Sequence, residues 1–159
     1  MRTHVRTVLA VLLAASLASL LFVGHSLAGP TTIILTASLS GDEEVPGPGD
    51  PNGSGFATIT LDPAAETVCF ELDWLQIRAP FAAHIHRGAT DVAGPVKVPL
   101  FEAEVPLPKT IKGVDGCVRD VNSDLIDRII ANPDNFYVNI HNRPFPDGAI
   151  RGQLSLAKS

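Results

Sequence analysis

The sequence predicts an all-β protein, an antiparallel β-sandwich with one short helix near residues 123–131. Short stretches of alternating apolar and polar residues recur between turn residues along most of the chain, a pattern typical of such folds. The 159 residues include 13 Gly and 13 Pro while only 18% are charged, which suits many turns better than long surface helices. With 45% apolar residues and no internal repeat, we expect one domain around one core.

The N-terminus has the layout of a secretory signal peptide. Arg2, His4 and Arg6 form a basic start, residues 8–23 are apolar or small, and residues 26–28 offer a signal-peptidase site. A membrane anchor is the alternative, but the apolar run is shorter than the roughly 20 residues that span a bilayer. We therefore expect residues 1–28 to be removed. The domain of residues 29–159 would then be secreted, extracellular or periplasmic, with no membrane attachment.

Two cysteines, Cys69 and Cys117, are expected to form one disulfide. An even pair in an oxidising compartment favours a bridge, which would close a loop of about 49 residues. Two thiolate metal ligands are the alternative, which the lack of any Cys-x-x-Cys spacing disfavours. Alternation over residues 67–74 places Cys69 on the polar face of its strand, so the bridge should pin a neighbouring segment.

The first strands follow from composition and alternation. Residues 31–39 are rich in β-branched side chains and predict a strand, which the Gly- and Pro-rich loop 41–55 ends. Residues 56–61 and 67–74 alternate and each predict a strand with one buried face. The inward residues expected there are Ala57, Ile59, Leu61, Val68, Phe70, Leu72 and Trp74.

The second half continues this pattern with one exception. We expect strands over residues 83–87, 95–101, 114–118, 136–141 and 150–156. Between the last two, Pro144, Pro146 and Asp147-Gly148 predict a turn and hence a terminal hairpin. The exception is the helix, where residues 125, 126, 129 and 130 recur at helical spacing, Asn122 or Ser123 can cap the start, and Pro133 lies beyond the end.

Three histidines are expected to share one polar surface. Successive side chains of a strand alternate, so His84 and His86 point to one face and Ala83 and Ile85 to the other. The same rule groups Tyr137, Asn139 and His141. In the terminal hairpin, Ile150, Gly152, Leu154 and Leu156 should fall on the apolar side, while Arg151 and Gln153 would flank Asn139 and His141.

This surface predicts a metal site with His84, His86 and His141 as ligands. Imidazole is a common ligand for copper and zinc, and three histidines suit copper ahead of zinc. Asn139, Arg151, Glu44 and Gln153 would then be supporting neighbours of the ligands. The alternative is a structural hydrogen-bond network that binds nothing, in which Glu44 neutralises Arg151. Catalytic use of the histidines ranks third.

Several separated motifs resemble one known family, the chordin-type (CHRD) domain of secreted proteins. They are residues 39–46 (LSGDEEVP), 83–88 (AHIHRG), 94–96 (GPV), 137–141 (YVNIH) and 146–154 (PDGAIRGQL). The resemblance implies an extracellular all-β domain, which could serve as a non-catalytic protein-interaction or matrix module. One departure is Ala93 where the family has Asn before Gly-Pro. His84-Ile85-His86 also resembles the His-x-His strand of secreted copper-zinc superoxide dismutases, so the expected sandwich is an immunoglobulin-like or superoxide-dismutase-like Greek key.

Charge and motifs exclude other classes of function. The net charge is −5 and the 12 Lys and Arg are scattered singly, so no nucleic-acid partner is expected. The chain has no Gly-x-Ser-x-Gly elbow and no Gly-rich phosphate loop. We therefore expect a metal ion as partner, or an extracellular protein, and enzymatic activity is not the first expectation.

Overall fold

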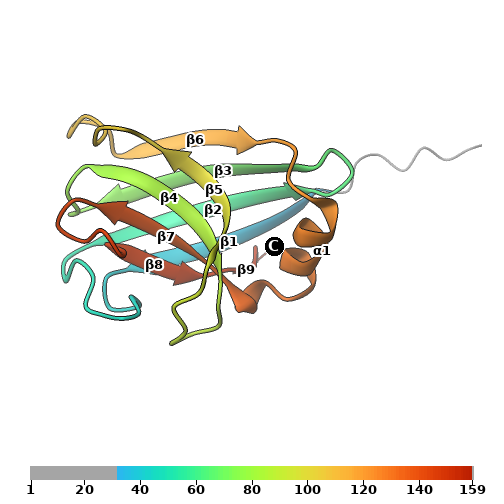
Figure 1. Ribbon diagram of the computed structural model, residues 1–159, viewed down its shortest axis with the longest axis horizontal. Coiled ribbons are helices and arrows are strands. Elements are labelled where there is room, and N and C mark those ends of the chain that lie inside the picture. The colour runs from blue at the N-terminus through green and yellow to red at the C-terminus, as the bar shows by residue number, and fades with distance from the viewer. Residues whose placement is uncertain (1–31, 159) are drawn as a thin grey trace, which may run out of the picture.

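Alternating stretches of the sequence form the strands of one antiparallel sheet in a computed structural model that describes residues 32–158. The expected signal peptide of residues 1–28 lies outside the described residues. The elements are β1 (Ile33–Ser40), β2 (Ser54–Asp62), β3 (Thr67–Leu75), β4 (Pro80–Arg87), β5 (Val96–Glu102), β6 (Gly113–Val118), α1 (Ser123–Ala131), the 3-10 turn η1 (Pro133–Asn135), β7 (Phe136–Asn142), β8 (Ile150–Gln153) and β9 (Ser155–Leu156). Figure 1 shows their arrangement.

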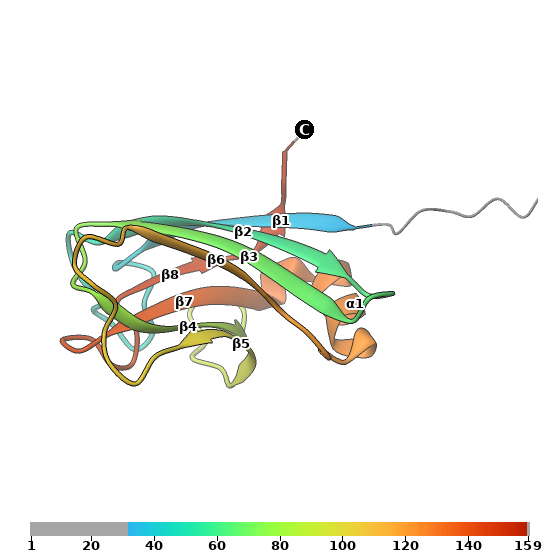
Figure 2. The ribbon, with the colours of Figure 1, turned by 90° about the horizontal axis from the view of Figure 1, so that it is seen from above.

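The sheet runs in the order β5-β4-β7-β8-β1-β2-β3-β6, and β9 pairs with β1. Figure 2 shows two layers, with β1, β2, β3 and β6 in one and β4, β5 and β7 in the other. The sheet passes from one layer to the other where β8 meets β1, with Arg151 opposite Ser40. The result is a flattened, nearly closed barrel, in which β5 and β6 are the two terminal strands of the sheet. The predicted all-β antiparallel architecture is confirmed.

The core lies between the two layers. The seven inward residues predicted for β2 and β3 are all buried, and Ala83, Ile85, Val138 and Ile140 meet them from the other layer. Helix α1 has the predicted bounds, and its N-terminus is capped by Asn122, whose side chain accepts a hydrogen bond from the Leu125 N–H. Ile126 and Ile129 are fully buried, so the helix closes one end of the barrel (Figure 1).

The disulfide Cys69–Cys117 is confirmed and joins directly opposed residues of β3 and β6. Cys69 is half-buried and Cys117 is exposed, so the bridge lies on the outside of the sheet, as the polar-face parity predicted. It fastens β6, the strand at one end of the sheet, to its only sheet neighbour among the described strands. Such bridges are typical of oxidising compartments.

The expected strand over residues 150–156 is wrong as a single element. It breaks at Leu154, whose N–H donates to the Phe136 carbonyl at 3.0 Å, and the chain then leaves β7 to pair with β1 as β9. Leu156 was expected on the apolar side, yet it is 60% exposed at the end of the two-residue strand β9, which pairs with Leu35 and Thr36 of β1. Among residues 32–158, no helix is both long and apolar enough to cross a membrane.

Candidate metal centre

Strands β4 and β7, far apart in sequence, lie side by side and bring the three histidines together. The register places His84 opposite Asn139 and His86 opposite Tyr137, with His141 opposite Ala82. One nitrogen from each of His84, His86 and His141 lies within 4.8 Å of the other two. The predicted grouping of these histidines on one surface is confirmed. Such a cluster could hold a metal ion.

Strand parity separates this cluster from the core. Ala83 and Ile85 are fully buried between the layers, while His84 and His86 point outward from the barrel. Outward here does not mean exposed, because every residue of β7 is buried. Loops cover the outer face of β4 and β7, so the histidines lie in a second, polar interior between the sheet and its connections.

The outer ring nitrogen of each histidine has a fixed partner. His86 Nδ1 lies 2.9 Å from the Gly94 carbonyl oxygen, and His141 Nδ1 lies 3.0 Å from the Pro146 carbonyl oxygen. His84 Nε2 lies 3.1 Å from a carboxylate oxygen of Glu102. Carbonyl and carboxylate oxygens accept only, so each of these nitrogens carries the proton.

The hydrogen bonds therefore aim three nitrogens at one another, His84 Nδ1, His86 Nε2 and His141 Nε2. His86 Nε2 is buried and has no hydrogen-bond partner among residues 32–158. His84 Nδ1 and His141 Nε2 are 3.1 Å apart, and with the outer nitrogens protonated two neutral rings present only lone pairs to each other there. A metal ion would satisfy both lone pairs, and without metal one additional proton shared between them, which gives one ring a positive charge, would do so. Ligating histidines in proteins typically bond their second nitrogen to a carboxylate or carbonyl in this way.

Burial keeps two of the imidazoles neutral. It lowers the pKa of His141 to about 4, with the nearby His84 adding to the effect against the Pro146 carbonyl. Burial also lowers the pKa of His86, although the Gly94 carbonyl opposes this. Neutral imidazole is the form that binds metal, so both rings are ready as ligands at neutral pH.

Tyr137 and Arg151 form a stack behind His86. The Tyr137 ring lies 4.9 Å from the His86 ring at an interplanar angle of 13°, and the Arg151 guanidinium carbon is 3.5 Å from the Tyr137 centroid. Arg151 is 2% exposed and donates to the carbonyls of Ala89 and Val92. The stack fixes the plane of the His86 ring and ties it to the loop after β4.

The expected pairing of Glu44 with Arg151 is not a direct contact. Glu44 instead accepts a hydrogen bond from Asn139 Nδ2 at 3.2 Å. Glu44 Oε1 and Asn139 Oδ1 are both buried and lack a partner within residues 32–158. Burial raises the pKa of Glu44 to about 7, against the lowering effects of Asn139 and Arg151. Gly148, at φ +154°, lets this carboxyl approach, since a side chain there would overlap it.

The hairpin places Arg151 opposite Asn139, as expected. Gln153 lies opposite Tyr137, so it does not flank His141. Gln153 donates to the carbonyls of Gly88 and Asp134, which holds the β4–β5 connection against η1. Gln153 therefore supports the loop that carries Gly94 rather than the histidines themselves.

Glu102 is the site residue that the sequence did not reveal. Strict alternation from Val98 and Leu100, both buried in the core, would point Glu102 inward. A shift in the β4–β5 register between Ala83 and His84 moves Glu102 to the histidine face instead. No pattern of residue types signals this shift, so the carboxylate that orients His84 is visible only in the structure.

Comparison with known proteins agrees with these motifs. Residues 35–154 match the family model described as CHRD domain. No curated protein and no solved structure matches the chain. The match covers most of the sequence, from β1 through the residue that follows β8, and includes all three histidines together with the disulfide. The chain therefore belongs to the CHRD domain family.

Proposed function

We propose that this protein is a secreted metal-binding domain that holds copper through His84, His86 and His141. The observation that carries the proposal is the unpartnered, buried Nε2 of His86 in a cluster where one nitrogen from each of the three histidines lies within 4.8 Å of the others. A buried nitrogen lone pair without a donor costs free energy, and a metal would satisfy it. The role that fits is metal sequestration, delivery or redox buffering outside the cytoplasm.

The donor set favours copper over zinc. Three neutral imidazoles supply nitrogen ligands only, and Cu²⁺ lies above Zn²⁺ in the order of affinities for such ligands. The nearest carboxylate, Glu102, bonds the outer nitrogen of His84 and so acts on the ligand rather than on the metal. Metal would reach the site beside His84, whose side chain is 12% exposed, next to the largely exposed Glu102.

A titration of the purified protein with Cu⁺, Cu²⁺ and Zn²⁺ tests the proposal. We expect one copper per chain, bound more tightly than zinc. His86→Ala should weaken copper binding by about 100-fold or more, since losing a ligand costs at least as much as losing a residue that orients one. Lys97→Ala, at an exposed position of the neighbouring strand β5, is the control and should bind normally. Absence of stoichiometric binding to the wild-type protein would refute the proposal.

Glu102→Gln is expected to weaken copper binding by roughly 10–100-fold, the usual effect of removing a group that orients a ligating histidine. Glutamine can still accept a hydrogen bond but lacks the charge that favours the His84 N–H. The control is Glu104→Gln, a neighbouring exposed carboxylate with no hydrogen bond to a histidine among the described residues. Competition with a copper chelator would measure both affinities, and equal values would contradict the role of Glu102.

A second candidate function is a non-catalytic extracellular interaction or matrix module. The direct His84–His141 hydrogen bond supports it, because the network can satisfy two of the three inward nitrogens without metal. In that case His86→Ala would only lower the melting temperature. A superoxide-dismutase-like activity ranks third, since residues 32–158 contain no second cluster of His, Cys, Asp or Glu suited to another metal. A copper-loaded protein with no turnover above free-copper controls would eliminate it.

A further inference from the structure

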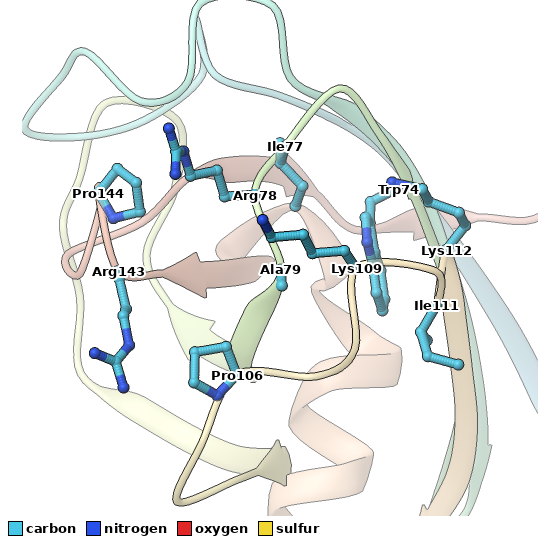
Figure 3. Close-up of a pocket in the computed structure, with 10 residues that line it drawn as sticks. All are labelled: Trp74, Ile77, Arg78, Ala79, Pro106, Lys109, Ile111, Lys112, Arg143 and Pro144. Atoms are coloured by element: carbon cyan, nitrogen blue, oxygen red, sulfur yellow. The ribbon is translucent and has the colours of Figure 1, made fainter.

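A pocket of about 500 Å³ lies between the connections at the barrel end opposite α1, apart from the histidine cluster (Figure 3). Three segments line it, the β3–β4 connection, the β5–β6 connection and the start of the β7–β8 connection. Its cations are Arg78, Lys109, Lys112 and Arg143, and its apolar lining is Trp74, Ile77, Ala79, Pro106, Ile111 and Pro144.

Hydrogen bonds hold these segments in place. Asn142, the fully buried last residue of β7, donates through its side chain to the Arg78 carbonyl and so ties the end of β7 to the β3–β4 connection. Leu107 donates to the Pro80 carbonyl at 2.8 Å, and Trp74 donates to the Lys112 carbonyl at 3.0 Å. The β5–β6 connection is therefore fastened at its middle and at its last residue, so the segments that line the pocket are held in place.

The charge of this pocket is opposite to that of the protein. Arg2 and Arg6 precede the described residues, so ten of the 12 Lys and Arg remain, and four of those ten line the pocket. No carboxylate lines it, and the ion pair found within residues 32–158 is elsewhere, between His84 and Glu102. Like charges gathered without a counter-charge repel one another, and a bound anion would relieve that repulsion.

The apolar residues of the pocket indicate which kind of anion would fit it. Ile111, 38% exposed, presents an apolar surface that a ligand can reach, and the buried Trp74 and Ile77 complete the apolar side of the pocket. Figure 3 shows Lys109 between the Trp74 side and the Arg143–Pro144 side. An inorganic anion would contact the cations and leave this surface unused. A molecule with an anionic group on an apolar ring would use both, as ligand pockets commonly do.

We propose that this pocket binds a small organic anion, a carboxylate or phosphate ester carried on an apolar ring. Lys109 holds the anionic group, Arg78 and Arg143 add positive charge on either side of it, and Ile111 contacts the ring on the apolar side that Trp74 and Ile77 close. The site is independent of the histidine cluster, so it neither requires nor predicts copper binding.

Trp74 is the only tryptophan of the chain and reports on the pocket directly. The experiment titrates the purified protein with phenyl phosphate, inorganic phosphate and benzyl alcohol, and measures Trp fluorescence and heat of binding. We expect phenyl phosphate to bind at one site and to change the fluorescence, and the other two to bind at least tenfold more weakly. Equal binding of inorganic phosphate would overturn the apolar part of the proposal, and equal binding of benzyl alcohol would overturn the anionic part.

Charge variants complete the test. The triple variant Arg78→Gln, Lys109→Gln, Arg143→Gln should weaken phenyl phosphate binding by tenfold or more, because charge-assisted hydrogen bonds are lost. The matched control neutralises Lys97, Arg119 and Arg128, three exposed cations outside this pocket, in the same way. Equal weakening in both would show a net-charge effect and overturn the site, as would absence of binding to the wild type. Unchanged melting temperature and circular dichroism establish that each variant is folded.

Discussion

Replacing both cysteines, Cys69→Ala with Cys117→Ala, is expected to lower the free energy of unfolding by about 4 kcal/mol. The bridge spans a sequence separation of 48 residues, and the chain-entropy relation for a loop of that size gives this value. Strand β6 depends on it particularly, because β6 lies at the end of the sheet and alternates between exposed and half-buried residues. Urea denaturation of variant and wild type would measure the loss.

Hydrogen exchange of individual strands distinguishes a local loss of stability in β6 from a general loss of stability in the core. We expect amide hydrogens of β6 to lose protection from exchange first, while those of β7 keep theirs, because all seven residues of β7 are buried. Wild type under reducing conditions should match the double variant. A loss below about 1 kcal/mol would mean that the β3–β6 ladder and the packing of Phe70 against Gly116 suffice to hold the strand.

Local patterns predict the parts of this molecule that depend on neighbours in sequence. Alternation places His84 and His86 on one face and Ile85 in the core, and helical spacing with an Asn122 cap gives α1 its bounds. Side-chain direction and capping are set by the nearest few residues, so the sequence carries them in full. The same holds for the polar-face position of Cys69.

Contacts between distant segments are predicted less well. The terminal hairpin forms as expected with Arg151 opposite Asn139, but Gln153 lies opposite Tyr137 rather than beside His141, and the hairpin ends at Leu154. Glu102 reaches His84 only through a β-bulge, and Glu44 selects Asn139 over Arg151 as its partner. The four pocket cations are scattered singly in the sequence, where they suggest no anion site, and only the fold gathers them. Each depends on geometry that residue types do not encode locally.

Glu44→Gln is expected to change how stability depends on pH by up to about 3 kcal/mol. Burial raises the pKa of Glu44 from 4.5 to about 7, so between those values the folded protein holds a proton that the unfolded chain has released. The contribution of this proton is present below pH 4.5 and is lost as the pH rises through 7. At 1.36 kcal/mol per unit, the wild type should lose about 3 kcal/mol relative to the variant between pH 4.5 and 8.

His141 affects the pH dependence of stability in the opposite direction to Glu44, which makes the difference between wild type and Glu44→Gln easier to detect. Its pKa falls from 6.5 to about 4, so its contribution is present above pH 6.5 and is lost as the pH falls through 4. In the wild type Glu44 opposes the histidines between pH 4.5 and 6.5, so the stability should rise less with pH than in Glu44→Gln. In Glu44→Gln the histidine effect stands alone, and His86, whose pKa is also lowered, adds to it.

Urea denaturation at pH 4.5, 5.5, 6.5 and 8, with a chelator present to keep the histidines metal-free, would measure both curves. The control is Glu43→Gln, which removes the same charge from the exposed neighbouring position and should run parallel to the wild type. If Glu44→Gln also runs parallel, the buried carboxyl is ionised in the folded protein. Its unpartnered oxygen would then need positive charge close by. Among the described residues, Arg151 and the histidines would have to supply that charge.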